Sequence, residues 1–249
     1  MKKIKVYDLP TRLFHWSFAA LFLGAFILAK TTGDESLAFA YHILIGIVLC
    51  FLIGLRIVWG FLGSKYARFS SFRLNPKELV IYFRDLLTSR TARFPGHNPA
   101  SSWAAVAMLS LGLGLGFSGY MMTQSSGNDF YEDLHELFAN AFIVVIAFHI
   151  LGLLIHSFRH KENIARSMLD GGKASFNESL DIKSSRPFAA VAFVFLVGAF
   201  TFHLIKNYDS ANRTLSTFGK TLQLGEVEDL SKNGVHEEKA RHRENDDDD

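Results

Sequence analysis

The chain has 249 residues, of which 49% are hydrophobic, 14% aromatic and 20% charged, and its formal net charge is +2. A soluble domain carries about 25% charged residues, whereas five stretches here are nearly uncharged and long enough to cross a hydrocarbon core of about 30 Å. The composition therefore excludes an ordinary soluble protein, and the small net charge does not indicate binding to nucleic acid.

Five membrane-spanning helices are predicted along the chain. They cover residues 13–29, 37–62, 103–122, 134–158 and 187–205. The first follows the polar segment 1–12 and has no clear small-residue cleavage site after it, so we interpret it as a span and not as a signal peptide. The sequence thus predicts an all-α integral membrane protein, with a four-helix transmembrane bundle in residues 1–172 and a fifth transmembrane helix within residues 173–205.

The orientation follows from the Lys and Arg residues in the connections, which gather on the cytoplasmic side of a membrane. Residues 1–12, 63–102 and 159–186 hold four, seven and six of them, whereas 30–36 holds one and 123–133 none. This asymmetry predicts a multi-pass protein of the bacterial inner membrane with a cytoplasmic N-terminus. The tail, residues 206–249, is then periplasmic, and its polar composition predicts a largely disordered segment or a docking segment for a partner.

The cysteine count limits the metal chemistry that is open to the chain. Cys50 is the single cysteine, which excludes internal disulfides, cysteine-liganded iron–sulfur clusters, thiolate zinc sites and covalent c-type haem attachment. Histidine is the remaining candidate ligand.

Four histidines within the spans fall at matching depths. Ionisable residues inside a membrane are costly and are by default candidates for function. His135 and His149 are fourteen residues apart on one predicted helix, so they share a face and lie roughly 21 Å apart along its axis. The alternating direction of the spans puts His42 at the level of His135 and His15 at the level of His149. The topology therefore predicts two bis-histidine sites stacked across the bilayer.

Such pairs suit the two axial positions of a haem iron. Zinc prefers a third or fourth protein ligand, and copper also prefers additional ones. The alternative is that each histidine only hydrogen-bonds a backbone carbonyl or a neighbouring helix. His156, seven residues after His149 on the same face, could ligate in its place or line the rim of a quinone site.

Three further residues are candidates for contact with the cofactor. Arg56 lies fourteen residues after His42 and is therefore expected at the level of His15 and His149, where a guanidinium can bind haem propionates. Arg12, one turn before His15, can serve likewise. The alternatives are snorkelling of Arg56 to the surface and a positive-inside anchor at Arg12. Gly46, one turn after His42, leaves room for a flat macrocycle.

Several segments together resemble the prokaryotic di-haem cytochrome b561 proteins and the related b-type cytochrome subunits of nickel–iron hydrogenases and formate dehydrogenases. The resemblance covers about residues 5–172 and rests on RLFHW at 12–16, YHILIG at 41–46, GHNP at 96–99, LHELFAN at 134–140 and FHILGLLIH at 148–156. It implies two haem b groups bound by His15, His42, His135 and His149, and electron exchange with membrane quinone.

The main functional hypothesis is an electron-transfer subunit of an oxidoreductase complex. It would carry electrons between the quinone pool and a periplasmic redox protein, which could be a hydrogenase, a c-type cytochrome or a reductase. One alternative is a stand-alone superoxide:quinone oxidoreductase, although the outer loops before the tail offer only Lys30 as a cation. The other is a non-redox transporter or scaffold that uses the histidines for protons or metal ions.

Overall fold

The computed structural model describes residues 2–33, 36–88, 94, 96–124, 129–160, 164–175 and 181–224. In these ranges, five helices are long and apolar enough to cross a membrane. They are α1 (Leu9–Thr31), α2 (Leu37–Leu62), α4 (Pro99–Gln124), α5 (Asp129–His160) and α7 (Pro187–Lys206). The predicted all-α integral membrane fold is confirmed, and each predicted span lies within one of these helices.

The helix boundaries follow from local capping residues. The carboxylate of Asp8 accepts a hydrogen bond of 2.9 Å from the backbone N–H of Thr11 at the start of α1, and Ser36 caps Phe39 at the start of α2 in the same way. Such caps satisfy backbone donors that a helix start leaves without partners. The cap at Asp8 starts α1 at Leu9, four residues before the predicted span, and the cap at Ser36 starts α2 at Leu37, where the span was predicted.

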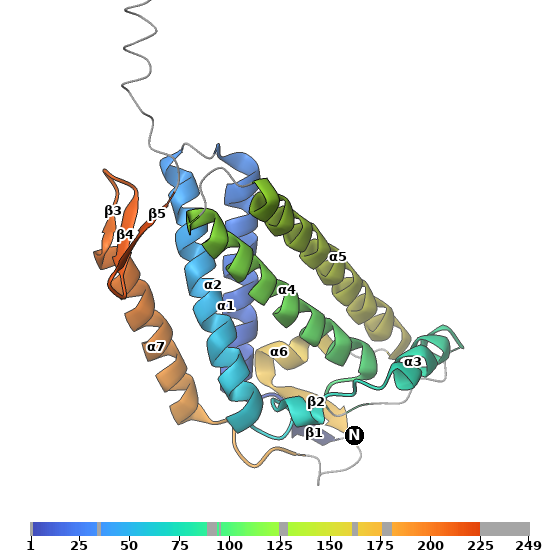
Figure 1. The fold of residues 1–249 in the computed structure, drawn as a ribbon. Coiled ribbons are helices and arrows are strands. Elements are labelled where there is room, and N and C mark those ends of the chain that lie inside the picture. Colours follow the sequence, from blue (N-terminus) through green and yellow to red (C-terminus); the bar gives the residue numbers. More distant parts are fainter. Residues whose placement is uncertain are drawn as a thin grey trace, which may run out of the picture.

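Helices α1, α2, α4 and α5 form the bundle (Figure 1), in which α1 packs on α2 and α4 packs on both α2 and α5. The glycines of α4 permit this close approach. A Cβ atom at Gly112 would lie 2.6 Å from Ile53 of α2, and one at Gly114 would lie 2.7 Å from the ring of Phe138 on α5. These small residues therefore serve helix packing.

Helix α7 packs on the outside of α1 and α2 and leads into a small antiparallel sheet. The sheet contains β3 (Tyr208–Asp209), β4 (Thr214–Thr217) and β5 (Lys220–Gln223). Leu215 and Leu224 are fully buried in one cluster with Ala40 and Leu44 of α2. The first part of the tail, to Leu224, is thus folded onto the bundle. Residues 225–249, on which the larger part of the expected disordered segment falls, lie outside the described ranges.

The opposite end of the bundle carries the N-terminus. Strand β1 (Lys2–Lys5) pairs antiparallel with β2 (Gly172–Ser175), from Lys2 opposite Ser175 to Lys5 opposite Gly172. Short helical turns η1 (Phe69–Ser71), η2 (Ile164–Arg166) and α6 (Ser167–Asp170) lie between the longer elements. The strand pair continues the bundle domain to Ser175, slightly beyond the expected boundary at 172.

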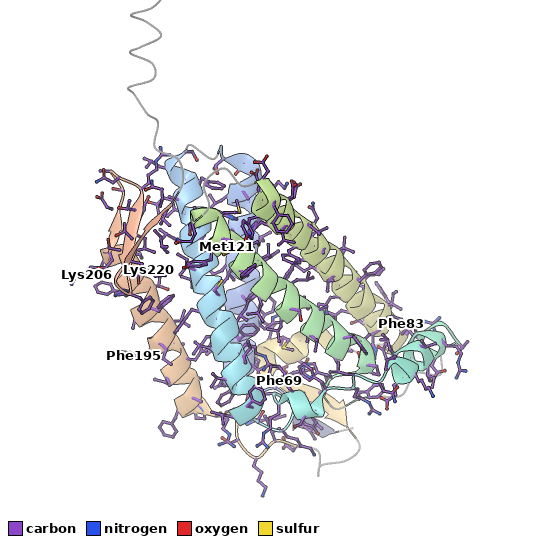
Figure 2. All side chains as sticks on the ribbon, viewed as in Figure 1. Phe69, Phe83, Met121, Phe195, Lys206 and Lys220 are labelled. Carbon is purple, nitrogen blue, oxygen red and sulfur yellow. The ribbon has the colours of Figure 1, made fainter. Side chains whose placement is uncertain are left out.

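An amphipathic helix that the spans did not include, α3 (Pro76–Thr88), also lies at this end. Its Tyr82 and Leu86 are buried, whereas Val80 and Phe83 are exposed, and Figure 2 labels Phe83 at this end of the molecule. We call the end that carries β1, β2, α3 and α6 the N-terminal end. The opposite end, which carries the three-stranded sheet β3–β5, is called the sheet end.

Candidate haem sites

His42 and His135 meet at the sheet end, near the starts of α2 and α5. Their ring centroids are 6.2 Å apart, with an angle of 75° between the ring planes. His42 Nδ1 lies 2.8 Å from the carbonyl oxygen of Ala25 on α1, and His135 Nδ1 lies 3.0 Å from Ser118 Oγ on α4. A carbonyl can only accept, so the proton of His42 is on Nδ1 and its Nε2 has a lone pair available for a metal.

This arrangement fits a bis-histidine haem. Two imidazoles on opposite sides of one metal ion have ring centroids about 6 Å apart, because each ring nitrogen lies about 2 Å from the metal and each centroid lies beyond its nitrogen. Hydrogen bonds from the second ring nitrogen orient such ligands. A Cβ atom at Gly46, one turn after His42, would meet nothing within 4 Å, whereas one at Gly119 would lie 3.4 Å from His135. No neighbouring side chain therefore obstructs the space beside Gly46, and its contact with a cofactor stays a prediction.

His15 and His149 meet at the N-terminal end, across a cavity of about 1250 Å³ that both side chains line. They are close enough to interact electrostatically, and the buried Nδ1 atom of His15 has no hydrogen-bond partner. Most of the lining is aromatic or aliphatic, and no Asp or Glu from the described part of the chain contributes to it. The volume exceeds the roughly 300–1,000 Å³ of an ordinary ligand pocket, which is large enough for a macrocycle.

The four predicted ligands thus form two pairs and no larger cluster. Within the described ranges, no three His, Cys, Asp or Glu side chains lie close enough to share a metal ion. The donor set at each level is two imidazoles, which matches the axial ligands of a haem iron better than the three or four protein ligands typical of zinc.

Between the two levels lies a stack of aromatic rings. Phe142 is seven residues from both His135 and His149 on α5 and is 1% exposed. Its ring stacks on Phe22 of α1 at 4.4 Å and on Phe18 at 6.0 Å. All three side chains line the cavity, and they lie between the two histidine pairs along the bundle.

Arg56 reaches the N-terminal cavity, as the spacing predicted. Its side chain is buried, its guanidinium lies 5.2 Å from the ring centroid of Phe69, and its Nη1 atom has no partner. Figure 2 shows Phe69 at the foot of α2. The fully buried Asp8 lies nearby and accepts hydrogen bonds from Trp59 Nε1 at 3.1 Å and from the backbone N–H of Ser64 at 3.3 Å. Asp8 thereby joins the start of α1 to the end of α2.

Arg12 lies in a different environment. Its Nε atom donates to the carbonyl oxygen of Met168 at 3.3 Å, and Trp16 Nε1 donates to the same oxygen at 3.0 Å. Arg12 is not among the residues that line the cavity. Its hydrogen bond to Met168 therefore connects α1 to α6. Contact between Arg12 and a cofactor stays a prediction.

A polar pair that the sequence did not reveal completes the cavity. His156 is buried, and its Nδ1 lies 3.2 Å from the hydroxyl oxygen of Tyr82 on α3. Asn98 Nδ2 donates to the same hydroxyl oxygen at 3.0 Å. Burial raises the pKa of Tyr82, and the hydrogen bond from Asn98 lowers it by less. His156 thus lines the cavity, and its role as a ligand or beside a quinone stays a prediction. The sequence feature that could have indicated Tyr82 is the amphipathic pattern of the residues after Pro76, which forms α3.

Comparison with known proteins gives the family. The family model of prokaryotic cytochrome b561 matches residues 6–171. The chain belongs to the prokaryotic cytochrome b561 family. It is also similar to a probable Ni/Fe-hydrogenase B-type cytochrome subunit of Rhizobium leguminosarum bv. viciae, with 25% identity over 211 residues that cover 68% of this chain and 88% of the relative. No solved structure matches the chain.

Membership of this family, together with the five apolar helices, makes the protein a multi-pass membrane b-type cytochrome that acts in electron transfer. The family implies haem b as its cofactor. The residues described above fit that group, because two facing imidazoles, open space beside Gly46 and a large cavity beside His149 are all present.

Proposed function

We propose that this cytochrome holds two haem b groups and carries electrons between a periplasmic redox partner and the membrane quinone pool. His42 and His135 would bind the haem at the sheet end, and His15 and His149 the haem at the N-terminal end. The observation that supports this most strongly is the 6.2 Å separation of the His42 and His135 rings, together with the location of His15 and His149 on one cavity. When bound, each haem supplies a one-electron carrier.

The protein's own residues have distinct parts in this function. Ala25 and Ser118 hold the rings of His42 and His135 through Nδ1, which leaves each Nε2 available as the atom that would bind the iron. The Phe142 stack lies between the two levels and presents aromatic rings to the N-terminal cavity. The two histidine levels are about four helical turns apart along α5.

The quinone site is proposed at the rim of the N-terminal cavity. Quinone chemistry needs a donor for the carbonyl oxygen and a route for protons, and the Tyr82–His156 pair offers both beside the His149 site. Tyr82 Oη can donate to the quinone while His156 exchanges a proton with the nearby surface. The exposed apolar residues of α3 would keep that helix at the membrane interface.

The orientation is proposed from the charges of the connections. Seventeen Lys and Arg residues lie in the segments at the N-terminal end and one in those at the opposite end before the tail. This supports a cytoplasmic N-terminal end, in the bacterial inner membrane, and a periplasmic sheet end. The resemblance to a hydrogenase cytochrome subunit supports a redox enzyme as partner at the sheet end.

Transfer of electrons across a vesicle membrane tests this function. Purified protein is placed in vesicles that enclose ferricyanide, and a quinol is added to the bilayer. We expect reduction of the enclosed ferricyanide to need the protein, and to be lost in both His42→Ala and His149→Ala. Equal rates in the wild type and in vesicles without protein would refute the function, as would full activity in either variant.

A further inference from the structure

Three side chains that can carry a positive charge converge on the N-terminal cavity from separate elements. Arg56 comes from α2, His97 from the connection before α4, and Lys173 from β2, and all three line the cavity. Burial, and then the charges of Lys173 and Arg56, lower the pKa of His97 to about 3. The three groups are therefore near enough to repel one another. Tyr7 and His149 also interact with the ring of His97, and Tyr66, Lys65 and Arg73 line a smaller pocket beside it.

Two nitrogen atoms of this group are buried without a partner. They are Nη1 of Arg56 and Nδ1 of His97. Buried polar atoms are nearly always hydrogen-bonded, and leaving one unpaired is costly. The carboxylate of Asp8 interacts with Arg56 electrostatically, but its oxygens accept from Thr11, Trp59 and Ser64. The cavity thus presents positive charge and an unpaired N–H of Arg56, and no Asp or Glu of the described chain lines it.

Aromatic rings and backbone carbonyls hold the three groups in place. The ring of His97 lies between Tyr7 and Phe72, at centroid distances of 5.7 and 4.8 Å, and hydrogen-bonds the backbone of Tyr66. Lys173 Nζ donates to the carbonyl oxygen of Gly96 at 2.8 Å and lies 5.3 Å from the ring centroid of Tyr7. The charges are thus fixed in position before any ligand arrives, which lowers the entropic cost of binding.

We propose that Arg56, His97 and Lys173 together form a binding site for the two carboxylates of the haem held by His15 and His149. This rests on the proposed function and adds His97 and Lys173 to the contact that the sequence suggested for Arg56. A guanidinium binds one carboxylate through two parallel hydrogen bonds, and an ammonium group pairs with another as a point charge. A carboxylate beside His97 also favours a second proton on its ring, which turns the free Nδ1 into a donor.

The test compares haem with haem dimethyl ester, which has the same ring and iron but no charged carboxylates. The full-length chain is purified without haem in a His42→Ala background, so that binding reports the N-terminal site. Dissociation constants are measured by absorbance titration for that protein, for Lys173→Met and Lys173→Arg, and for Lys183→Met as a control. Lys183 is exposed in the same connection and does not line the cavity.

We expect haem to bind at least about tenfold more tightly than the diester, since charge-assisted hydrogen bonds are the strong ones. Lys173→Met should lose most of this preference while its affinity for the diester stays unchanged, and Lys173→Arg and Lys183→Met should keep the preference. Equal affinity for haem and for the diester at the unsubstituted site would overturn the proposed carboxylate site and leave the proposed haem function standing. So would an equal loss of both ligands in Lys173→Met. Binding of neither would instead overturn the proposed haem function.

Discussion

Ser118 provides a sharp test of the sheet-end site because it contacts a predicted ligand without being one. Ser118 is fully buried, and its Oγ lies 2.9 Å from the carbonyl oxygen of Gly114 and 3.0 Å from His135 Nδ1. The hydroxyl proton goes to the carbonyl, since a carbonyl can only accept. Ser118 Oγ is then the acceptor for the Nδ1 proton of His135, which leaves Nε2 of His135 free for iron. Ser118→Ala removes this acceptor.

The expected loss can be estimated from the contacts. Removing a residue that orients a metal-ligating histidine costs about 10–100-fold in metal affinity. The carbonyl oxygen of Leu115 also hydrogen-bonds His135, so part of the orientation remains and the loss should be near tenfold. The hydrogen bond to Ser118 makes the imidazole more basic and so favours ferric iron. Its removal should raise the midpoint potential of this haem by up to about 60 mV, which corresponds to a tenfold difference for one electron.

The assay is a redox titration combined with the rate of haem release from purified protein. Ser110→Ala is the control, because Ser110 is an exposed serine on the same helix. We expect Ser118→Ala to raise the potential and the release rate of one haem and to leave the other unchanged. Equal changes in both haems, or the same result in Ser110→Ala, would refute the assignment of His135 as a ligand oriented by Ser118.

Three further predictions address other parts of the protein. Gly46→Leu should displace haem from the sheet-end site alone, because the leucine side chain would occupy the open space beside His42. The haem content should fall by about half, while the helix content measured by circular dichroism stays unchanged. Tyr82→Phe should slow haem reduction by quinol several-fold and leave haem content unaltered. Because burial raises the pKa of Tyr82 above its ordinary value of 10.0, this hydroxyl stays protonated, and the ratio of the wild-type rate to the variant rate should be constant from pH 6 to 9. A ratio that changes across that range would contradict Tyr82 as the donor. Asp8→Ala should destabilise the chain by about 1–3 kcal/mol because it leaves the half-buried Trp59 Nε1 without its acceptor. Thermal unfolding in detergent measures this loss against Asp133→Ala, at an exposed position of α5, as control.

The spans and the histidine pairs could be predicted because they depend on helix geometry alone. The interval of fourteen residues between His135 and His149 places both on one face of a straight helix, and the direction of each span then sets the depth of His15 and His42. The resulting pairing of His42 with His135 agrees with the 6.2 Å between their rings. Arg56 reached the expected level for the same reason.

The elements outside the spans were harder to predict because tertiary packing decides them. Strands of two to four residues, such as those between Tyr208 and Gln223, carry little local signal, and Leu215 is buried only because α2 offers Ala40 and Leu44 as neighbours. Lys173 and His97 likewise lie far apart in the sequence, and the pairing of β1 with β2 is needed to place Lys173 at the cavity. Arg12 satisfied the helical spacing but hydrogen-bonds Met168, a residue that no periodicity brings near it.

The most direct measurement of the central claim is the haem-to-protein ratio, from a reduced-minus-oxidised spectrum, for the wild type, His42→Ala and His149→Ala. Two bis-histidine sites predict a b-type spectrum with about two haems per chain in the wild type and about one in each variant, with the remaining haem differing between the variants in potential. One haem in the wild type, or a haem content that neither change alters, would contradict the pairing of His42 with His135 and of His15 with His149.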